Sequence, residues 1–190
     1  GGRLKILTRP IPLLIVLLFA GAVGWSIYYF LQRPGVPPES QLQIALQHLD
    51  AGENEDAQKA AHKLEDAGYS SPEFPGGVAF ILGATAFREA AHDEEAARDQ
   101  KYMTAATQLK SAEQLTLIPE RRPEWSYALG VSLHQIGSTD ESIPLLQEAV
   151  ETYPPGRIEA ALMLADTFLL SHDKAVTEQA LKLNTTVISI

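Results

Sequence analysis

The sequence predicts an all-α protein, with one N-terminal transmembrane helix followed by a domain built of helices. An uncharged apolar run occupies residues 11–31, and a proline-rich stretch follows it. From there to the end of the chain, apolar residues recur almost everywhere at the spacing of a helix. Alternating strand patterns are missing from the sequence, except that residues 185–190 are rich in β-branched side chains.

Residues 1–10 form a short basic stub, with Arg3, Lys5 and Arg9 and no acid. The charge balance reverses beyond residue 35, where eleven basic and twenty-four acidic residues leave a net charge of −13. Nucleic-acid binders need a cationic face, because neutralising the phosphates releases their counterions. The acidic body therefore excludes nucleic acid as a partner.

The run at residues 11–31 predicts a membrane-spanning helix. It holds 21 residues without a charge, and as a helix they cover roughly 30 Å, the thickness of a bilayer's hydrocarbon core. Trp25, Tyr28 and Tyr29 stand near its C-terminal end, where aromatic rings settle among lipid headgroups. The alternative is a signal peptide cleaved at the small residues 20–22. The apolar run continues well past them, which favours an uncleaved anchor.

The flanking charges predict the orientation of this helix. Three basic residues precede the span, and only Arg33 follows it closely. Because positive flanks stay in the cytoplasm, we expect a cytoplasmic N-terminus, with residues 39–190 across the membrane. In a bacterium this describes a single-pass inner-membrane protein with a periplasmic domain. Residues 32–38 contain three prolines and one glycine, which predicts a short, stiff linker between the two parts.

The clearest helical pattern in the chain spans residues 127–155. Residues 127–136 have the apolar spacing of one helix, and residues 140–152 have that of a second. Gly137 lies between them, where a residue in the left-handed conformation can end the first helix. Gly130 is small where two helices must touch closely. We therefore expect a helix–turn–helix unit in which these glycines serve packing.

Both ends of the second helix carry signals of their own. Ser138 and Glu141 offer a capping box at its start, and the double proline at 154–155 stops it. Pro144 is unusual, because it removes a backbone donor near the start of the helix.

This unit resembles the tetratricopeptide repeat. The family pattern places large and small residues along two helices and ends at a proline, and it is matched here by Leu129, Gly130, Leu133, Gly137, Ser142, Leu146, Ala149 and Pro154. The family's tryptophan position holds Ser126 instead, with Trp125 one residue earlier. The resemblance implies an α-α superhelix of stacked helix pairs, in which no pair can bury its apolar face alone.

Weaker copies of the pattern extend the resemblance over residues 39–190. The equivalent small residues are Ala45, Gly83, Gly130 and Ala165, spaced by 38, 47 and 35 residues around a family period of about 34. The long interval predicts additional residues around 91–103 that extend both helices of the second pair. The resemblance thus divides the domain into about four helix pairs, at residues 39–71, 76–119, 123–156 and 157–190.

The resemblance also implies a binding groove on the concave surface of the superhelix, which usually holds peptides or partner helices. The groove positions carried over to this sequence are Phe80, Ala84, Phe87, Arg88, Tyr127, Val131, His134, Gln135, Leu162 and Asp166. Aromatic side chains with a few polar groups suit an extended peptide or an amphipathic helix. The alternative for Phe80 and Phe87 is that they pack against the next repeat.

The sequence lacks the patterns that catalysis and cofactor binding require. It has no cysteine, which excludes disulfides, thiolate metal sites and a cysteine nucleophile. Its five histidines are scattered without the spacing of a metal site. A glycine-rich phosphate loop and a nucleophile elbow are also missing from the sequence. We therefore expect no enzyme, no cofactor, no metal site and no small-molecule substrate.

The sequence thus predicts a membrane-tethered scaffold or adaptor that binds a protein or peptide partner in the groove of its repeats. Two alternatives remain open. The first is a structural subunit of an inner-membrane complex, held mainly by its spanning helix, as in ancillary factors of the protein-export machinery that have a similar architecture. The second is the interaction part of a larger membrane protein whose catalytic domain lies outside this chain.

The basic stub leads to a prediction about topology. Because Arg3, Lys5 and Arg9 hold the N-terminus in the cytoplasm, a reporter enzyme that works only in the periplasm should be active when fused after Ile190. Replacing the three basic residues by glutamine should weaken this bias. Activity of a cytoplasmic reporter alone at the same fusion point would mean that the orientation is reversed.

Overall fold

The computed structural model describes residues 37–170, and this part of the chain forms helices and turns without a β-strand. Its seven α-helices are α2 (Pro38–Asp50), α3 (Asn54–Asp66), α4 (Gly77–Ala90), α5 (Glu95–Gln114), α6 (Arg122–Gln135), α7 (Thr139–Thr152) and α8 (Arg157–Leu170). Two short 3₁₀ turns precede α6 and α8, namely η1 (Pro119–Arg121) and η2 (Pro154–Gly156). The predicted all-α class is confirmed for these residues.

The chain divides into two compact units, Gly1–Pro37 and Pro38–Ile190, and every described helix belongs to the second unit. The predicted membrane helix at residues 11–31 and the β-branched end at residues 185–190 lie outside the described range. Among residues 37–170, no helix combines the length and the apolar character that crossing a membrane requires.

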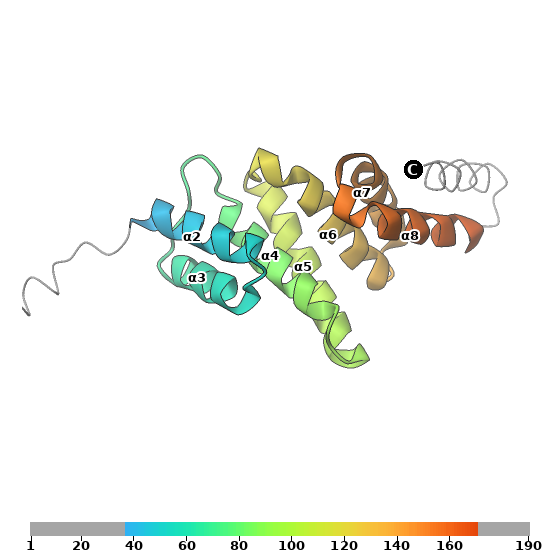
Figure 1. The fold of residues 1–190 in the computed structure, drawn as a ribbon, viewed down its shortest axis with the longest axis horizontal. Helices are drawn as coiled ribbons and strands as arrows, with labels where there is room; N and C mark the ends of the chain where they lie inside the picture. The colour runs from blue at the N-terminus through green and yellow to red at the C-terminus, as the bar shows by residue number, and fades with distance from the viewer. Residues whose placement is uncertain (1–36, 171–190) are drawn as a thin grey trace, which may run out of the picture. The chain divides into compact units, whose positions relative to one another are not determined.

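The described helices pack as a series of pairs (Figure 1). Each helix from α2 to α8 contacts the next one along the chain, and short turns join α2 to α3, α4 to α5 and α6 to α7. Alternate helices also contact one another, α2 with α4, α4 with α6 and α6 with α8. We call these four helices the even-numbered row, and they carry the candidate site described below.

Two glycines allow the paired helices to approach closely. A Cβ on Gly83 in α4 would lie 2.6 Å from Cγ of Leu109 in α5, and a Cβ on Gly130 in α6 would lie 3.1 Å from Cγ of Leu146 in α7. Both leucine side chains are fully buried. The predicted close contact at Gly130 is therefore confirmed, and Gly83 occupies the equivalent position in the preceding pair.

The turns after α2 and α6 share one backbone geometry. Gly52 and Gly137 adopt positive φ angles of 78° and 81°. In each turn, the amide of the residue after the glycine donates to the carbonyl five residues earlier, at 2.9 Å for Glu53 and 2.8 Å for Ser138. A left-handed residue with this bond is a common way to end a helix. The predicted role of Gly137 is therefore confirmed.

The start of α7 differs from the prediction. Ser138 precedes the helix, but its side chain forms no capping hydrogen bond. The Glu141 carboxylate instead accepts a hydrogen bond from Lys110 of α5 at 2.6 Å. The predicted capping box is therefore wrong, because an ion pair with another helix takes the glutamate side chain. Pro144 lies inside α7 and is exposed to solvent.

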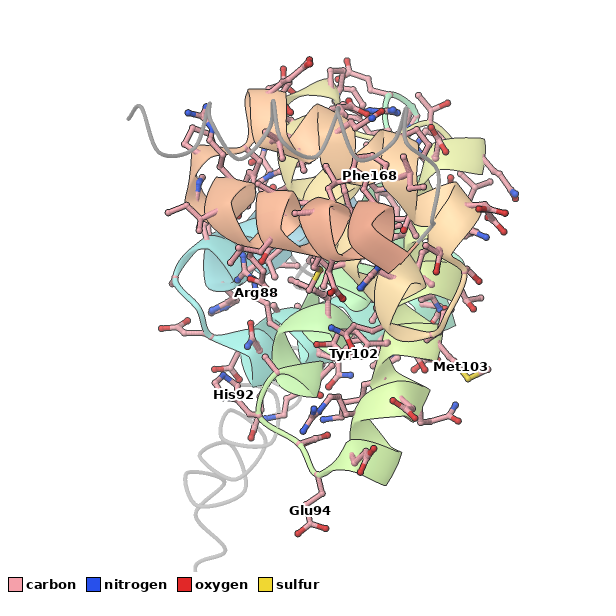
Figure 2. All side chains as sticks on the ribbon, turned by 90° about the vertical axis from the view of Figure 1, so that its right-hand side faces the viewer. Arg88, His92, Glu94, Tyr102, Met103 and Phe168 are labelled. Atoms are coloured by element: carbon pink, nitrogen blue, oxygen red, sulfur yellow. The ribbon has the colours of Figure 1, made fainter. Side chains whose placement is uncertain are left out.

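The additional residues of the second pair lengthen one helix and not both. α5 has 20 residues against 14 in α7, whereas α4 and α6 have 14 each. The predicted extension is therefore wrong for α4. Lys101 of α5 holds the end of this pair together, because it pairs with Glu89 at 2.9 Å and with Asp93 at 2.8 Å. Figure 2 shows His92 and Glu94 at the projecting turn between α4 and α5.

Trp125 connects the second pair to the third. Its ring is buried, and its Nε1 donates a hydrogen bond to the Leu109 carbonyl at 2.7 Å. The Arg122 guanidinium lies 4.3 Å from the centre of the ring. Leu109 therefore contacts both Gly83 and Trp125, so packing within one pair and packing against the next share a residue.

The glycine contacts predict a large effect of a bulky side chain at either position. Gly83→Leu and Gly130→Leu should each lower the free energy of unfolding by about 1–3 kcal/mol or more, because overpacking forces side chains and backbone to move. Thr107→Ala, on the exposed side of α5, is the control and should change it by no more than about 0.5 kcal/mol. Chemical denaturation followed by circular dichroism measures these changes. Unchanged midpoints for both leucine variants would contradict the close contacts.

Candidate binding face

Arg88 joins three helices of the even-numbered row. Its guanidinium donates to the Leu49 carbonyl at the end of α2 and to Oε1 of Glu124 in α6, the latter at 2.7 Å. The last carbonyls of a helix have no partner within the helix, so Arg88 caps α2 while it pairs with α6. The Arg88 side chain is 30% exposed and that of Glu124 is 14% exposed. The pair is therefore largely shielded from water.

Arg121 forms a second link between α2 and α6. It donates two hydrogen bonds to the Asp50 carboxylate, at 2.6 and 2.7 Å, and its guanidinium lies 3.4 Å from the Glu124 carboxylate. The hydrogen bond from Arg121 is the main reason that the pKa of the Asp50 carboxyl is lowered. A guanidinium that faces a carboxylate with two parallel bonds combines strength with a defined geometry. Arg88 and Arg121 thus belong to one network that fixes α2, α4 and α6 together.

Four aromatic side chains form a continuous aromatic cluster, namely Phe87, Tyr102, Tyr127 and Tyr153. The rings of Phe87 and Tyr127 meet edge to face with centroids 5.5 Å apart, and those of Tyr127 and Tyr153 stack at 5.1 Å. Tyr102 of α5 lies 6.2 Å from Phe87. Such arrangements stabilise aromatic pairs beyond the burial of their area. The aromatic cluster therefore connects the second pair to the third beside the arginine network.

Tyr127 also contacts the start of α8. Its hydroxyl donates to the Glu159 carboxylate, and its ring covers Gly156, where a Cβ would lie 2.4 Å from Cε2. Burial raises the pKa of the Tyr127 hydroxyl, and the hydrogen bond to Glu159 raises it further. The hydroxyl therefore stays protonated at neutral pH and serves as a donor to α8.

The contacts between α6 and α8 show that these helices run in the same direction. Tyr127 contacts Glu159 in the first half of both helices. In the second half, Nδ1 of His134 lies 3.4 Å from Oγ1 of Thr167. Parallel alternate helices present equivalent residues on the same side of the row. The side of α8 next to Glu159 therefore continues the surface that Tyr127 begins.

An apolar strip lies on the solvent side of α8. Ile158 and Leu162 are 64% and 62% exposed, the highest values among the large apolar side chains of the described residues. They lie one helical turn apart and on either side of Glu159 along the chain. Asp166 follows one turn further on and is exposed. We call Ile158 and Leu162 the α8 strip.

The structure separates the predicted groove residues by burial. Phe80, Ala84 and Val131 are no more than 1% exposed, so their prediction as groove contacts is corrected. These side chains belong to the core, because neighbouring helices cover them. The partly buried members are Phe87, Arg88, Tyr127 and His134, and the exposed members are Gln135, Leu162 and Asp166.

Several residues of this face were not predicted from the sequence, namely Asp50, Tyr102, Arg121, Glu124, Tyr153, Ile158 and Glu159. The sequence does contain a signal for the two glutamates. Glu124 lies six residues before Gly130, and Glu159 lies six residues before Ala165, the equivalent small residue of the next pair. Ile158 lies four residues before Leu162, the spacing of one helix face. Tyr153 stands at the end of α7 and has no such signal.

One further group combines a histidine with two carboxylates. His48, Glu53 and Asp56, at the turn from α2 to α3, place their ligand atoms within 4.8 Å of one another. The His48 ring and the Glu53 carboxylate share a hydrogen bond, and both carboxylates are exposed to solvent. A bound cation would have to replace that bond and displace water, so we assign no metal to this group.

No protein-family model, no curated protein and no solved structure matches this chain. Its function is therefore inferred from its own residues and contacts.

The arginine network predicts unequal effects of two glutamate substitutions. Glu124→Gln keeps the size of the side chain but removes the charge that Arg88 and Arg121 share, and it should lower the free energy of unfolding by about 1–3 kcal/mol. Glu141→Gln removes an exposed partner of Lys110 and should cost about 1 kcal/mol at most. Urea denaturation of both variants measures the difference. Equal costs would show that the network is no more important than a surface ion pair.

Proposed function

We propose that this chain is a membrane-tethered scaffold that binds a protein partner through the even-numbered row, with an extended peptide or an amphipathic helix as the ligand. In this role, residues 11–31 are the membrane anchor and residues 39–190 form a superhelix similar to tetratricopeptide repeats. In a bacterium, the anchor places this domain in the periplasm, at the inner membrane.

Three recurring features of the described helices support the repeat proposal. Alternate helices contact one another along the row. A glycine meets a buried leucine both between α4 and α5 and between α6 and α7. The same left-handed glycine turn follows α2 and α6. Stacked helix pairs of this kind present an extended surface to a partner.

The α8 strip is the observation that carries the binding proposal. Ile158 and Leu162 expose neighbouring apolar side chains beside the hydrogen bond between Tyr127 and Glu159. Covering an exposed aliphatic side chain contributes about 1.5–3 kcal/mol. Exposed apolar surface with a polar rim is typical of interaction sites. The geometry fits two apolar side chains of a partner helix or peptide laid along α8.

The charges around the strip favour a basic partner. Glu159 and Asp166 form its polar rim, and Asp166 forms no ion pair with any residue between 37 and 170. The chain as a whole has a formal net charge of −9. Lysine or arginine beside the apolar side chains of a partner would complement this rim. Charges at a rim guide encounter and orientation more than they add affinity.

The arginines and the tyrosine hydroxyl of this face are held by partners within the chain. The Tyr127 hydroxyl is bonded to Glu159, while Arg88 and Arg121 are paired with Glu124 and Asp50. A general base or a nucleophile needs a side chain that is free to meet a substrate. We therefore propose binding without catalysis at this face.

The α8 strip leads to a prediction with a matched control. Ile158→Ser combined with Leu162→Ser should weaken capture of the partner at least tenfold, because the loss of two apolar contacts exceeds 1.4 kcal/mol. The control combines Met103→Ser in α5 with Leu115→Ser just after its end, where the side chains are 53% and 49% exposed. Figure 2 shows Met103 pointing away from α8. Both double variants should melt like the parent chain.

Quantitative cross-linking in membranes of the source cell, followed by mass spectrometry, measures capture. Loss of the partner from the α5 control, with normal capture by the α8 variant, would move the binding site to the odd-numbered helices. Capture that needs only residues 1–35 would instead favour the alternative of a membrane-complex subunit held by its spanning helix.

A further inference from the structure

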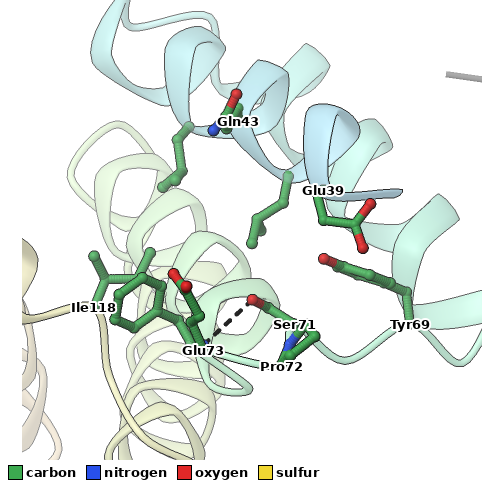
Figure 3. A pocket seen from close by; sticks show the side chains of 10 residues that line it. Glu39, Gln43, Tyr69, Ser71, Pro72, Glu73 and Ile118 are labelled. Carbon is green, nitrogen blue, oxygen red and sulfur yellow. Dashed lines mark hydrogen bonds between the residues drawn. The ribbon is translucent and has the colours of Figure 1, made fainter. Parts of the chain in front are cut away.

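A second concave site lies away from the α8 strip, between α2 and the loop that joins α3 to α4. Its volume is about 420 Å³, within the range of ligand pockets in proteins. The walls are mainly apolar and include Leu42, Leu46, Phe74 and Ile118 (Figure 3). The size and the apolar walls suit one or two side chains of a bound segment.

The Tyr69 hydroxyl is buried and has no hydrogen-bond partner among the described residues. Tyr69 lines the pocket, and its hydroxyl is directed into it in Figure 3. The neighbouring Ser71 hydroxyl is already engaged, because it accepts a hydrogen bond from the Phe74 amide at 3.2 Å. Buried polar groups in native proteins nearly always have a partner. The lone hydroxyl therefore indicates a polar atom that the chain itself does not supply.

Two carboxylates line the same pocket. Glu39 and Glu73 are exposed, and neither forms an ion pair within the described part of the chain. Glu39 lies in the first turn of α2, where the helix dipole favours a carboxylate. Glu73 lies in a loop, so no helix dipole accounts for its carboxylate. Two unpaired carboxylates beside an apolar pocket complement a ligand that combines an apolar group with a cation.

We propose that this pocket is a second peptide-binding site, specific for a segment in which apolar side chains are followed by lysine or arginine. The apolar side chains lie against Leu42, Leu46 and Ile118. A backbone carbonyl of the peptide accepts the hydrogen bond that the Tyr69 hydroxyl offers. The basic side chain lies near Glu39 and Glu73. The site shares no residue with the α8 strip, so it stands independently of the proposed function.

Removing the Tyr69 hydroxyl tests whether it binds a ligand, because the change should weaken peptide binding without lowering the stability of the free chain. Tyr69→Phe removes an unsatisfied buried group from the free chain, so the melting temperature should stay equal or rise. The same change removes a donor from the complex, so the peptide should bind about tenfold more weakly. A tyrosine that only packs in the core would lose or gain stability without changing peptide affinity.

The measurement uses the full chain in nanodiscs of phosphatidylcholine and a fluorescein-labelled peptide, Gly-Ser-Leu-Phe-Lys-Arg-amide, followed by fluorescence anisotropy. Two counterparts replace Leu-Phe by Ser-Ser or Lys-Arg by Glu-Glu. Glu39→Gln combined with Glu73→Gln should weaken binding of the parent peptide about tenfold. Glu120→Gln combined with Glu151→Gln, two exposed carboxylates outside the pocket, is the matched control and should leave its affinity unchanged.

Several results would overturn this site. They are equal binding of all three peptides, unchanged affinity in Tyr69→Phe, or no saturable binding of the parent peptide below about 1 mM. Binding to nanodiscs that lack the protein would identify the lipid as the target of the peptide. The double variant of Ile158 and Leu162 should bind this peptide normally, so failure of this site and failure of the α8 strip are separable.

Discussion

The approach of two helices at a single glycine is the constraint on which the other contacts of the described helices depend. Gly83 lets Leu109 enter the space between α4 and α5. The Leu109 carbonyl then accepts the hydrogen bond of Trp125, which joins this pair to the next. A side chain at residue 83 would push α5 outward and move that carbonyl away from the indole. The same contact recurs at Gly130, so the second and third pairs are built by one rule and can stack on each other.

Packing at the glycines sets the distance between helices, and charge sets their lateral positions. Arg88 and Arg121 tie the end of α2 to α6 through Asp50 and Glu124, and the aromatic cluster fills the adjoining space between the second and third pairs. These contacts hold α2, α4 and α6 together within the chain itself. A preorganised surface loses little conformational entropy on binding. The exposed apolar side chains of α8 therefore lie on a frame that is already in place.

Two tyrosines differ in whether the chain itself supplies a hydrogen-bond partner for the hydroxyl. The Tyr127 hydroxyl donates to Glu159, so its polar requirement is met within the chain and the residue fixes α8 against α6. The Tyr69 hydroxyl is also shielded from water, but no group among residues 37–170 accepts its hydrogen. Burial without a partner is unfavourable, and the pocket beside Tyr69 is large enough for a ligand that provides one.

The spacing of residues was enough to predict the helices, the turn at Gly137 and the close contact at Gly130, because these features arise within single helices or one helix–turn–helix unit. The partners of individual side chains could not be predicted in this way. Phe80 is buried in the core, and Glu141 pairs with Lys110 instead of capping its own helix. Arg121 pairs with a carboxylate 71 residues earlier in the chain. A local pattern carries no information about partners so distant, since the stacking of successive pairs brings them together.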